Sequence, residues 1–502
     1  MKYKCTRDSS MTVTASQAIV QGIAENGGLF VPETLPDYTL DDLKEMQGMD
    51  YFGRAAKVVA DFLPEFTAEE IEDCVQGAYG NNKFSGGNPA PVVSVKDGEN
   101  TLNFLELWHG PTCAFKDMAL QLLPHLLTRS LKKTDCDKTA VILVATSGDT
   151  GKAALEGFRD VPGTRMLVFY PVHGVSAMQK RQMNTQEGRN VSVCAIEGNF
   201  DDAQTGVKRI FTDSAIKENL DQHGMLFSSA NSINWGRLLP QIVYYFSAYC
   251  DMAQQGTIAM GDKINVVVPT GNFGNILAGY YAWKMGLPVN KFLCASNANN
   301  VLTEFLTTGR YDRKRQFYAT ISPSMDILIS SNLERLLYDA TGHDCKKVSG
   351  WMKELTEEGC YQVDGETFRT ISDVFDAGFC DDDATLKTIR QVFDSSGYLC
   401  DTHTAVAVRV YEDYVERTKD DTPAVIVSTA SPYKFAPSVL AAVDDEFDKE
   451  QDDFAMVARL SALTRTEVPQ PIADLEHKEI RFQNVCTKEA MGEVLLQLLD
   501  LT

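Results

Sequence analysis

Residues 104–121 read Phe-Leu-Glu-Leu-Trp-His-Gly-Pro-Thr-Cys-Ala-Phe-Lys-Asp-Met-Ala-Leu-Gln, and the rest of the chain is organised around them. The apolar residues at the start of this stretch predict a short strand. His109-Gly-Pro-Thr112 ends it, because Gly and Pro interrupt regular structure. From Ala114 onward, apolar side chains recur at helical spacing. We therefore expect Lys116 in the first turn of a helix, beside the aromatic ring of Phe115.

A lysine at the start of a helix has altered acid–base chemistry. The positive end of the helix dipole lies there, so a cation loses its proton more readily. Burial against Phe115 and Trp108 acts in the same direction, because desolvation disfavours the charged amine. A lysine that is neutral near pH 7 suits Schiff-base chemistry. Lys116 alone does not separate this interpretation from a solvated lysine at a helix end.

The composition is that of a folded protein of two or three domains, with 502 residues of which 44% are hydrophobic and 23% charged. The formal net charge of −22 argues against nucleic acid and anionic membrane surfaces as partners. It does not argue against a small anionic substrate, because such a ligand responds to local charge only.

Cysteine usage and the absence of long apolar runs indicate the cellular compartment in which the protein works. The twelve cysteines are scattered between Cys5 and Cys486, without a Cys-x-x-Cys pair or a Cys/His cluster of zinc spacing. We therefore expect no metal, and reduced thiols as in the cytoplasm. No apolar run approaches the roughly 18 residues of a membrane helix, and the N-terminus lacks the apolar core of a signal peptide. The sequence predicts a cytoplasmic protein.

The chain divides into three parts. Residues 1–90 have helical spacing in several segments, including one that Thr67 and Glu70 open as a capping box, and they predict a helical N-terminal domain. Residues 91–435 alternate strands and helices, which predicts an α/β fold with doubly wound parallel sheets. Their length predicts two lobes, the smaller at about 138–228. The clearest signals, with none assigned between 300 and 420, are a strand at 141–145 and helices at 200–220, 235–252 and 275–285. Residues 436–502 predict a polar, mostly helical C-terminal segment.

Two loops follow strands in the positions where open parallel sheets bind ligands. Thr146-Ser-Gly-Asp-Thr-Gly151 supplies hydroxyls, glycines and backbone N–H groups at a helix start, which favours an anion or an amino-acid substrate. Pro269-Thr-Gly-Asn-Phe-Gly-Asn275 lacks the spacing of a dinucleotide fingerprint or a P-loop. Its glycines still allow a phosphate to meet the backbone directly. Either segment could also be a plain turn.

A third loop, Ser428-Thr-Ala-Ser-Pro432, follows the strand predicted at 424–428. Small hydroxyl residues at a strand end can bond to a polar heterocycle. Alone this signal is weak, and an ordinary turn explains it equally well.

Taken together, these motifs resemble pyridoxal-phosphate enzymes of the tryptophan synthase β-chain type, and more closely the threonine synthase family. The resemblance is carried by five segments, His109–Asp117, Ser147–Gly151, Gly198–Gln204, Asn231–Asn234 and Pro269–Gly274, and by Gly27–Pro32 in the N-terminal part. The spacing is similar to the longer fungal and enterobacterial branch, so the resemblance implies a monomer or a weak homo-oligomer. It also implies fold type II, with two α/β lobes around one molecule of pyridoxal 5'-phosphate.

The resemblance implies a role for each cofactor-binding residue. Lys116 would be the Schiff-base lysine and the catalytic acid and base. The backbone amides of Gly271, Asn272, Phe273, Gly274 and Asn275 would hold the cofactor phosphate. Thr429 would face the pyridine nitrogen, which a hydroxyl leaves largely unprotonated, so that the ring is a milder electron sink.

The implied activity is that of a lyase in threonine biosynthesis, which converts O-phospho-L-homoserine and water to L-threonine and phosphate. Ser147, Gly148, Asp149 and Thr150 would hold the amino-acid end of the substrate. The substrate phosphate needs donors, and the candidates are Asn231, Ser232, Asn234, Lys180 and Arg237, with Arg181 beside Lys180. Arg237 is favoured because a guanidinium can bind two phosphate oxygens.

Two alternatives stay open. A serine/threonine dehydratase, or a phospho-lyase acting on a related phosphorylated amino acid, would share the cofactor but release a keto acid. A non-catalytic homologue would share only the fold, and the presence of Lys116 and both loops argues against it.

Overall fold

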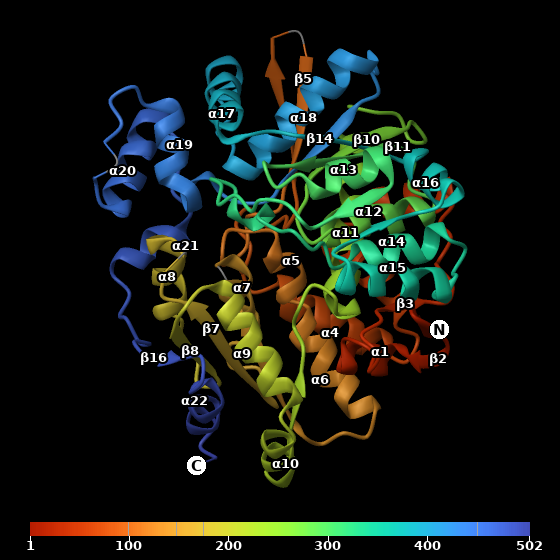
Figure 1. Cartoon of the computed structure of the whole chain (residues 1–502). Helices are drawn as coiled ribbons and strands as arrows, with labels where there is room; N and C mark the ends of the chain where they lie inside the picture. Colours follow the sequence, from red (N-terminus) through yellow and green to blue (C-terminus); the bar gives the residue numbers. More distant parts are fainter. Residues whose placement is uncertain (99, 147, 174, 449, 502) are drawn as a thin grey trace.

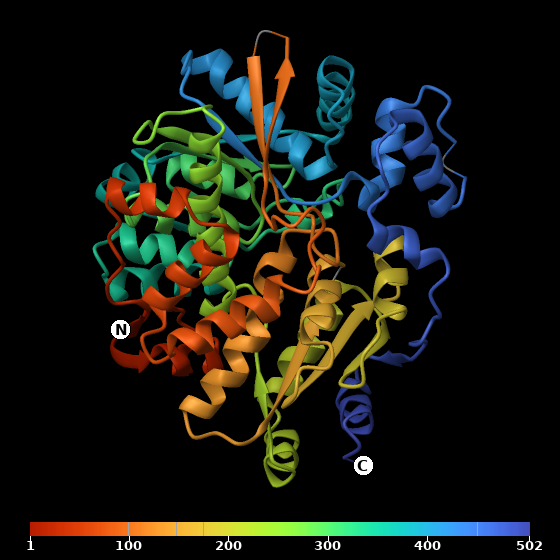
Figure 2. The same ribbon diagram turned by 180° about the vertical axis from the view of Figure 1, so that it is seen from behind.

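The computed structural model describes residues 1–98, 100–146, 148–173, 175–448 and 450–501. Its architecture is two α/β lobes with an N-terminal unit packed against the larger one (Figures 1 and 2). In Figure 1 the larger sheet lies in the upper half and the smaller one at the lower left. The two doubly wound lobes expected from the sequence are therefore confirmed.

The N-terminal unit combines helices with a small antiparallel sheet of order β2-β1-β3. The sheet was not foreseen, because its strands are short and their polar residues mask the alternation of a strand. The capping box of Thr67 and Glu70 is confirmed at the start of α4. The elements are β1 (Lys2–Cys5), β2 (Asp8–Thr14), α1 (Ala15–Gln21), β3 (Phe30–Pro32), α2 (Leu40–Gln47), α3 (Tyr51–Phe62) and α4 (Ala68–Tyr79).

The larger sheet has the order β14-β11-β10-β15-β5-β4, and all its neighbours are parallel except the edge pair β4 and β5. Val266 and Val268 of β10 enter one apolar core and Val267 enters another, because successive side chains point to opposite faces. The sheet is therefore buried on both faces. Its strands are β4 (Val92–Asp97), β5 (Asn100–Glu106), β10 (Ile264–Pro269), β11 (Val289–Ser296), β14 (Phe375–Phe379) and β15 (Ala424–Ser428).

Helices cover both faces of the larger sheet. On one side α11 packs on α12 and on the N-terminal helices, and on the other α18 packs on β10, β11 and β15. The sequence predicted α11 and α12 but left residues 300–420 unassigned. The elements are α11 (Trp235–Gln254), α12 (Gly274–Lys284), α13 (Val301–Thr308), β12 (Arg310–Asp312), η1 (Pro323–Met325), α14 (Leu333–Ala340), α15 (Cys345–Glu357), β13 (Cys360–Gln362), α16 (Gly365–Ser372), α17 (Asp382–Ser396) and α18 (Thr402–Thr418).

The smaller sheet is wholly parallel, with the order β16-β8-β7-β6-β9. Ile142 and Val144 of β6 face one core, and Val141 and Leu143 face another, which α9 covers. The expected helix at 200–220 is two helices, divided at Asp213. The elements are β6 (Thr139–Ala145), α7 (Asp149–Phe158), β7 (Thr164–Pro171), α8 (Ala177–Asn184), β8 (Val191–Glu197), α9 (Phe200–Thr212), α10 (Ser214–Gln222) and β9 (Met225–Ser228).

The C-terminal segment runs along the left of Figure 1, first beside α17 of the larger lobe and then beside the smaller lobe. It is mostly helical, as expected, but it also supplies β16, which pairs with β8 and completes the smaller sheet. Its elements are η2 (Pro432–Phe435), α19 (Ala436–Val443), α20 (Asp453–Thr464), α21 (Gln470–Ala473), η3 (Asp474–Glu476), β16 (Val485–Thr487) and α22 (Met491–Leu498).

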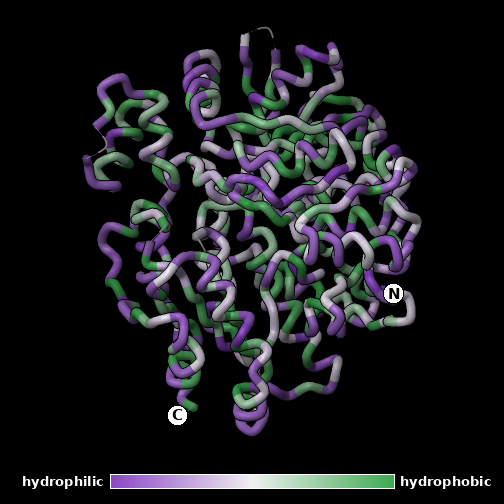
Figure 3. Tube along the Cα trace, in the orientation of Figure 1, coloured by the Kyte–Doolittle hydropathy of each residue, from purple (hydrophilic) through white to green (hydrophobic). Residues whose placement is uncertain are grey.

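Between the lobes lies α5 (Lys116–Leu120), and α6 (Leu123–Lys133) follows it and packs on α1 and α4 of the N-terminal unit. Hydrophilic segments lie mainly at the periphery and apolar ones inside (Figure 3). Within the described ranges, no helix combines the length and the apolar character needed to cross a membrane.

Candidate active site

Lys116 is the first residue of α5, as the sequence predicted, and α5 lies between the two sheets (Figure 1). Its side chain is 12% exposed. The Nζ atom is 3.5 Å from Ser324 Oγ, 3.9 Å from Asp149 Oδ2 and 5.5 Å from the centre of the Phe115 ring. The lysine thus has one carboxylate and one hydroxyl in reach, and otherwise an enclosed surrounding.

Enclosure changes the acid–base behaviour of this lysine. Burial lowers the pKa of Lys116 to about 8; Asp149 opposes the shift, and the positive charges of Lys434 and Arg237 add to it. About a tenth of the molecules would therefore carry a neutral amine at pH 7. The lowered pKa inferred from the helix start is present, with desolvation as the main cause.

The loop after β10 presents a row of free backbone donors. Strand β10 ends at Pro269 and α12 begins at Gly274, and the left-handed φ of 63° at Phe273 turns the chain between them. Among the described residues, no acceptor binds the N–H groups of Gly271, Asn272, Phe273, Gly274 or Asn275. Among the residues that the structure describes, the atom nearest to a Cβ built at Gly274 is Asn332 Nδ2, at 3.5 Å. The loop thus has the open space and the donors that an anion needs at a helix N-terminus.

The side chain of Asn275 adds another free donor beneath this loop. Its Oδ1 accepts hydrogen bonds from Tyr244 at 2.8 Å and Tyr245 at 2.5 Å. Its Nδ2 is buried and has no acceptor in the part of the chain that the structure describes. A buried amide N–H without a partner is costly, so an absent acceptor is implied.

Thr429 joins Lys116 and this loop in one place. Strands β10, β15 and β5 are neighbours, so the loops at their carboxyl ends meet at one edge of the sheet. The carbonyl of Thr429 accepts from the Phe115 N–H at 2.8 Å, and Ala114 and Ala430 form a β-bridge. Thr429 is 5% exposed.

These residues fit pyridoxal phosphate. The free N–H groups of residues 271–275 suit its phosphate, the enclosed Lys116 suits its aldehyde carbon, and Thr429 suits a polar ring atom. The carboxylate and imidazole clusters of a metal centre are absent from the described part of the chain.

The loop after β6 is built around an internal ion pair. Asp149 starts α7 and lies 2.9 Å from Lys434 Nζ. Burial would raise the pKa of Asp149, but the ammonium groups of Lys434 and Lys116 and a hydrogen bond from Gln179 hold it below its usual range. Gly148 has a φ of 155°, and a Cβ there would meet Gln179 at 2.4 Å. Thr150 lies in the first turn of α7, and Ser147 lies outside the described residues.

Arg237 carries a buried positive charge that no negative charge of the described residues balances. It lies in the first turn of α11, is 4% exposed, and donates through Nη1 to the Ala230 carbonyl at 2.9 Å. Its Nε has no acceptor and the guanidinium no carboxylate partner among the described residues. Burial lowers its pKa to about 10. A buried guanidinium without an anionic partner is unfavourable, and a ligand that carries negative charge would stabilise it.

Two other candidates for the substrate phosphate already make hydrogen bonds within the protein. The Nδ2 of Asn234 donates to Ile19 O and Ser229 O, and its Oδ1 caps α11 through Gly236. Asn234 therefore acts as a helix cap, which leaves no donor for a substrate. Lys180 donates to the Val172 carbonyl in its own lobe.

The remaining candidates for the substrate phosphate differ in the exposure of their side chains and in the hydrogen bonds they already make. Arg181 donates to three carbonyls of residues 475–478 and holds the C-terminal segment. Asn231 is exposed and Ser232 half-buried, next to the buried Arg237. Asn231 is thus the most accessible member of this set, whereas Ser232, Lys180 and Arg181 are all half-buried.

Sequence reasoning missed Lys434, Ser324 and His403. Lys434 follows the third loop by two residues, so its position was visible, but nothing predicted its burial. The Nδ1 of His403 is 2.8 Å from Asp401 Oδ1, and its Nε2 accepts from the Ser324 N–H at 3.2 Å. Ser324 lies in the region between 300 and 420 that the sequence left unassigned.

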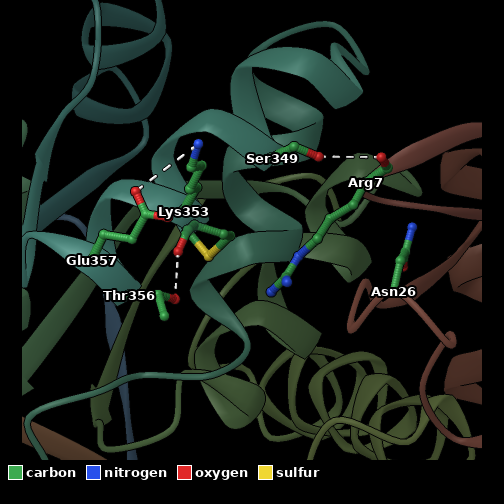
Figure 4. A pocket seen from close by; sticks show the side chains of 7 residues that line it. Arg7, Asn26, Ser349, Lys353, Thr356 and Glu357 are labelled. Carbon is green, nitrogen blue, oxygen red and sulfur yellow. Dashed lines mark hydrogen bonds and ion pairs between the residues drawn. The ribbon is translucent and has the colours of Figure 1, made fainter.

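A surface hollow of about 430 Å³ lies elsewhere, between the N-terminal unit and α15 (Figure 4). Its lining is Arg7, Asn26, Ser349, Met352, Lys353, Thr356 and Glu357. None of these is a residue of the site around Lys116.

Comparisons with known proteins agree with this geometry. Residues 85–430 match the family described as "Pyridoxal-phosphate dependent enzyme". Residues 2–79 match "Threonine synthase N terminus", and residues 404–494 match "Threonine synthase, C-terminal". The fold and the site define a pyridoxal-phosphate-dependent enzyme.

Individual relatives narrow the class. Threonine synthase from Pseudomonas aeruginosa is 38% identical over 90% of this chain and 94% of the relative. The structure of pyridoxal-phosphate-bound threonine synthase from Brucella melitensis superposes with a TM-score of 0.87 at 36% identity, over 99% of both chains. Threonine synthase-like 1 from Macaca fascicularis is 41% identical over 87% of this chain, which spans only 59% of that relative's length. The chain belongs to the threonine synthase family.

Proposed function

We propose that this chain is a pyridoxal-phosphate-dependent lyase that converts O-phospho-L-homoserine and water to L-threonine and phosphate. One observation carries the proposal: two separate anion sites flank the same enclosed lysine. The free N–H row of residues 271–275 is one, and the unpaired guanidinium of Arg237 is the other. A phosphorylated cofactor together with a phosphorylated substrate requires two such sites.

Each residue then has a distinct task. Pyridoxal phosphate, when bound, supplies an electron sink for the bonds at the substrate's α-carbon. The N–H groups of residues 271–275 and Asn275 Nδ2 would hold its phosphate, and Thr429 would offer a hydroxyl to its ring nitrogen. Lys116 would hold its aldehyde carbon and, once released by substrate, would move protons at Cα and Cβ, for which a pKa near the working pH is favourable.

The substrate phosphate is assigned to Arg237, with Ser232 and Asn231 at the rim. The guanidinium lies in the first turn of α11, so the helix dipole adds to its attraction for an anion. The phosphate must leave from Cγ before water adds at Cβ, and a buried cation stabilises the charge that develops on the leaving group. The loop at 148–150 is assigned to the amino-acid end of the substrate.

A second function within the same class is a phospho-lyase that releases a keto acid. It is kept because relatives named "threonine synthase-like" share as much sequence with this chain as the threonine synthases do. The products separate the two: L-threonine for the first, a 2-oxo acid with ammonia for the second.

The test is to reduce the purified, yellow protein with borohydride and map the modified peptide. We expect the cofactor on Lys116 alone, and Lys116→Ala to lose both the colour and phosphate release from O-phospho-L-homoserine. A modified lysine elsewhere, or turnover by Lys116→Ala at the wild-type rate, would refute the assignment.

We also propose a cytoplasmic location and a monomer or weak homo-oligomer. All twelve cysteines lie in described parts of the chain, and each is a free thiol, which supports a reducing compartment. Sedimentation of the purified protein tests the oligomeric state.

A further inference from the structure

Lys434 is a second lysine in the site, fully buried and linked to both lobes. It lies in η2, which follows β15 of the larger sheet. Its Nζ donates to the Thr112 carbonyl at 2.8 Å and is 2.9 Å from Asp149 Oδ1. Thr112 belongs to the segment that leads into Lys116, so Lys434 contacts the loop before the reacting lysine and the carboxylate beside it.

Asp149 connects this lysine to Lys116. Its Oδ1 accepts from Lys434 and from Gln179 at 3.1 Å. Its Oδ2 is 3.9 Å from Lys116 Nζ and accepts from Ser324 Oγ at 3.4 Å. One carboxylate oxygen therefore faces each lysine, and the Lys434 contact fixes the orientation of the oxygen that faces Lys116.

The pair also crosses from one lobe to the other. Asp149 begins α7, directly after β6 of the smaller sheet, whereas Lys434 follows β15 of the larger one. A buried ion pair contributes little net stability compared with a well-packed apolar pair, because removing two charges from water is costly. Its place beside the reacting amine therefore calls for a reason other than stability.

We propose that Lys434 is a positioning residue, which holds the Asp149 carboxylate against Lys116 and joins the two lobes across the reacting lysine. The proposal rests on the proposed function only in taking Lys116 as that lysine. It assigns Asp149 to the lysine pair and not to a direct contact with the substrate's amino group.

The charges around Lys116 predict the direction in which each substitution moves its titration midpoint. The charged groups that face Lys116 are Asp149 from α7, Lys434 from η2, Arg237 from α11 and its neighbour Asp117. Loss of the positive charge at Lys434 favours the ammonium form of Lys116, so its titration midpoint moves up. Loss of the negative charge at Asp149 moves the midpoint down. The two substitutions therefore act in opposite directions.

The experiment measures the titration of Lys116 in the full-length chain after the cofactor is removed, by trace acetylation and peptide mass spectrometry across pH. Rebinding of pyridoxal phosphate shows that each preparation is folded. We expect Lys434→Met to raise the Lys116 midpoint by about one pH unit and Asp149→Asn to lower it by a similar amount.

The matched control is Lys152→Met. Lys152 is a buried lysine on α7 whose Nζ is 3.2 Å from Glu156. It is not among the charges that act on Lys116. It should leave the midpoint within about 0.3 of a pH unit. A shift equal to that of Lys434→Met would mean general loosening and would overturn the proposal.

If Lys434→Met does not fold, the nearly isosteric Asp149→Asn still decides the matter. A raised or unchanged Lys116 midpoint in that variant would overturn the proposal, because loosening exposes the amine and raises its pKa. In the holoenzyme, where substrate would release Lys116 from the cofactor, the acid limb of kcat should move in the same direction as each midpoint. The labelling needs no turnover, so failure of the proposed activity would appear separately, in wild-type phosphate release.

Discussion

At the scale of single residues, Arg237 differs from an ordinary buried arginine in the contacts that its guanidinium makes. An ordinary buried arginine satisfies its donors within the protein, as Arg54 does with Met46, Ser247 and Asp251. Arg237 has one backbone acceptor and no carboxylate in the described structure. Arg237 thus has an unused donor and an unbalanced charge, both of which a bound phosphate would satisfy.

Arg237→Ala should lower kcat/KM for O-phospho-L-homoserine at least tenfold. A lost charge-assisted phosphate contact costs about 1.5–3 kcal/mol, and more where the contact strengthens in the transition state. Arg237→Lys should recover only part, because an ammonium cannot bind two oxygens at once. Steady-state phosphate release measures the effect, and cofactor absorbance should stay normal. Arg54→Ala is the control, with a lower Tm and unchanged kcat/KM. Wild-type kcat/KM in Arg237→Ala would move the phosphate site elsewhere.

Arg237→Met should make the ligand-free protein more stable. It removes an unpaired guanidinium that is 4% exposed and that meets the positive end of the α11 dipole, while it keeps most of the apolar volume. We expect the free energy of unfolding to rise by about 1 kcal/mol or more. Denaturant unfolding without cofactor or substrate measures it. A fall in stability would show that the bond to Ala230 outweighs the burial of charge.

At the scale of elements, the start of α12 should bind the cofactor through its backbone. Gly274→Val places a branched side chain in the open space before this helix, where the described atom nearest to the added Cβ is Asn332 Nδ2, at 3.5 Å. The variant should therefore fold but lose affinity for pyridoxal phosphate at least tenfold, which corresponds to about 1.4 kcal/mol. Absorbance titration with the cofactor measures the affinity. Gly350→Val, in open space on α15, is the control and should bind normally. Wild-type affinity in Gly274→Val would rule out the phosphate loop.

The sequence was most informative about elements that carry strong local signals. The run at 141–145, the glycines at 271 and 274 and the helix start at Lys116 each follow from local chemistry, and the structure has the corresponding elements. Residues 300–420 gave no such signal, so Ser324 and His403 were not found. Asn234 caps α11 through the nearby Gly236 N–H, which is a local contact. Its bond to the Ile19 carbonyl could not be foreseen, because Ile19 is distant in sequence. The burial of Lys434 depends on contacts between lobes, which local patterns do not contain.

At the scale of the whole molecule, the C-terminal segment completes the smaller lobe. Strand β16 pairs with β8, and Met491, Leu495 and Leu499 share an apolar core with β6, β7 and α9. Met491 lies directly against Gly206 of α9. The smaller lobe is therefore assembled from residues that are almost 300 positions apart in sequence.

Met491→Ala should loosen the smaller lobe without affecting the larger one. A fully buried methionine truncated to alanine costs about 2–5 kcal/mol. Hydrogen exchange should show lost protection in β8, α9 and β16, while β10 and α12 keep theirs. The control is Leu463→Ala, at a side chain that is 46% exposed, which should change little. Equal loss of protection in both lobes would mean that they do not unfold separately.

The most direct test of the whole account follows oxygen through the reaction. The wild-type protein is incubated with O-phospho-L-homoserine in water enriched in oxygen-18, and both products are analysed by mass spectrometry. Phosphate leaves from Cγ with its bridging oxygen and water adds at Cβ. The account therefore predicts L-threonine labelled at its hydroxyl and phosphate without label. Labelled phosphate with homoserine, or a 2-oxo acid in place of threonine, would contradict it.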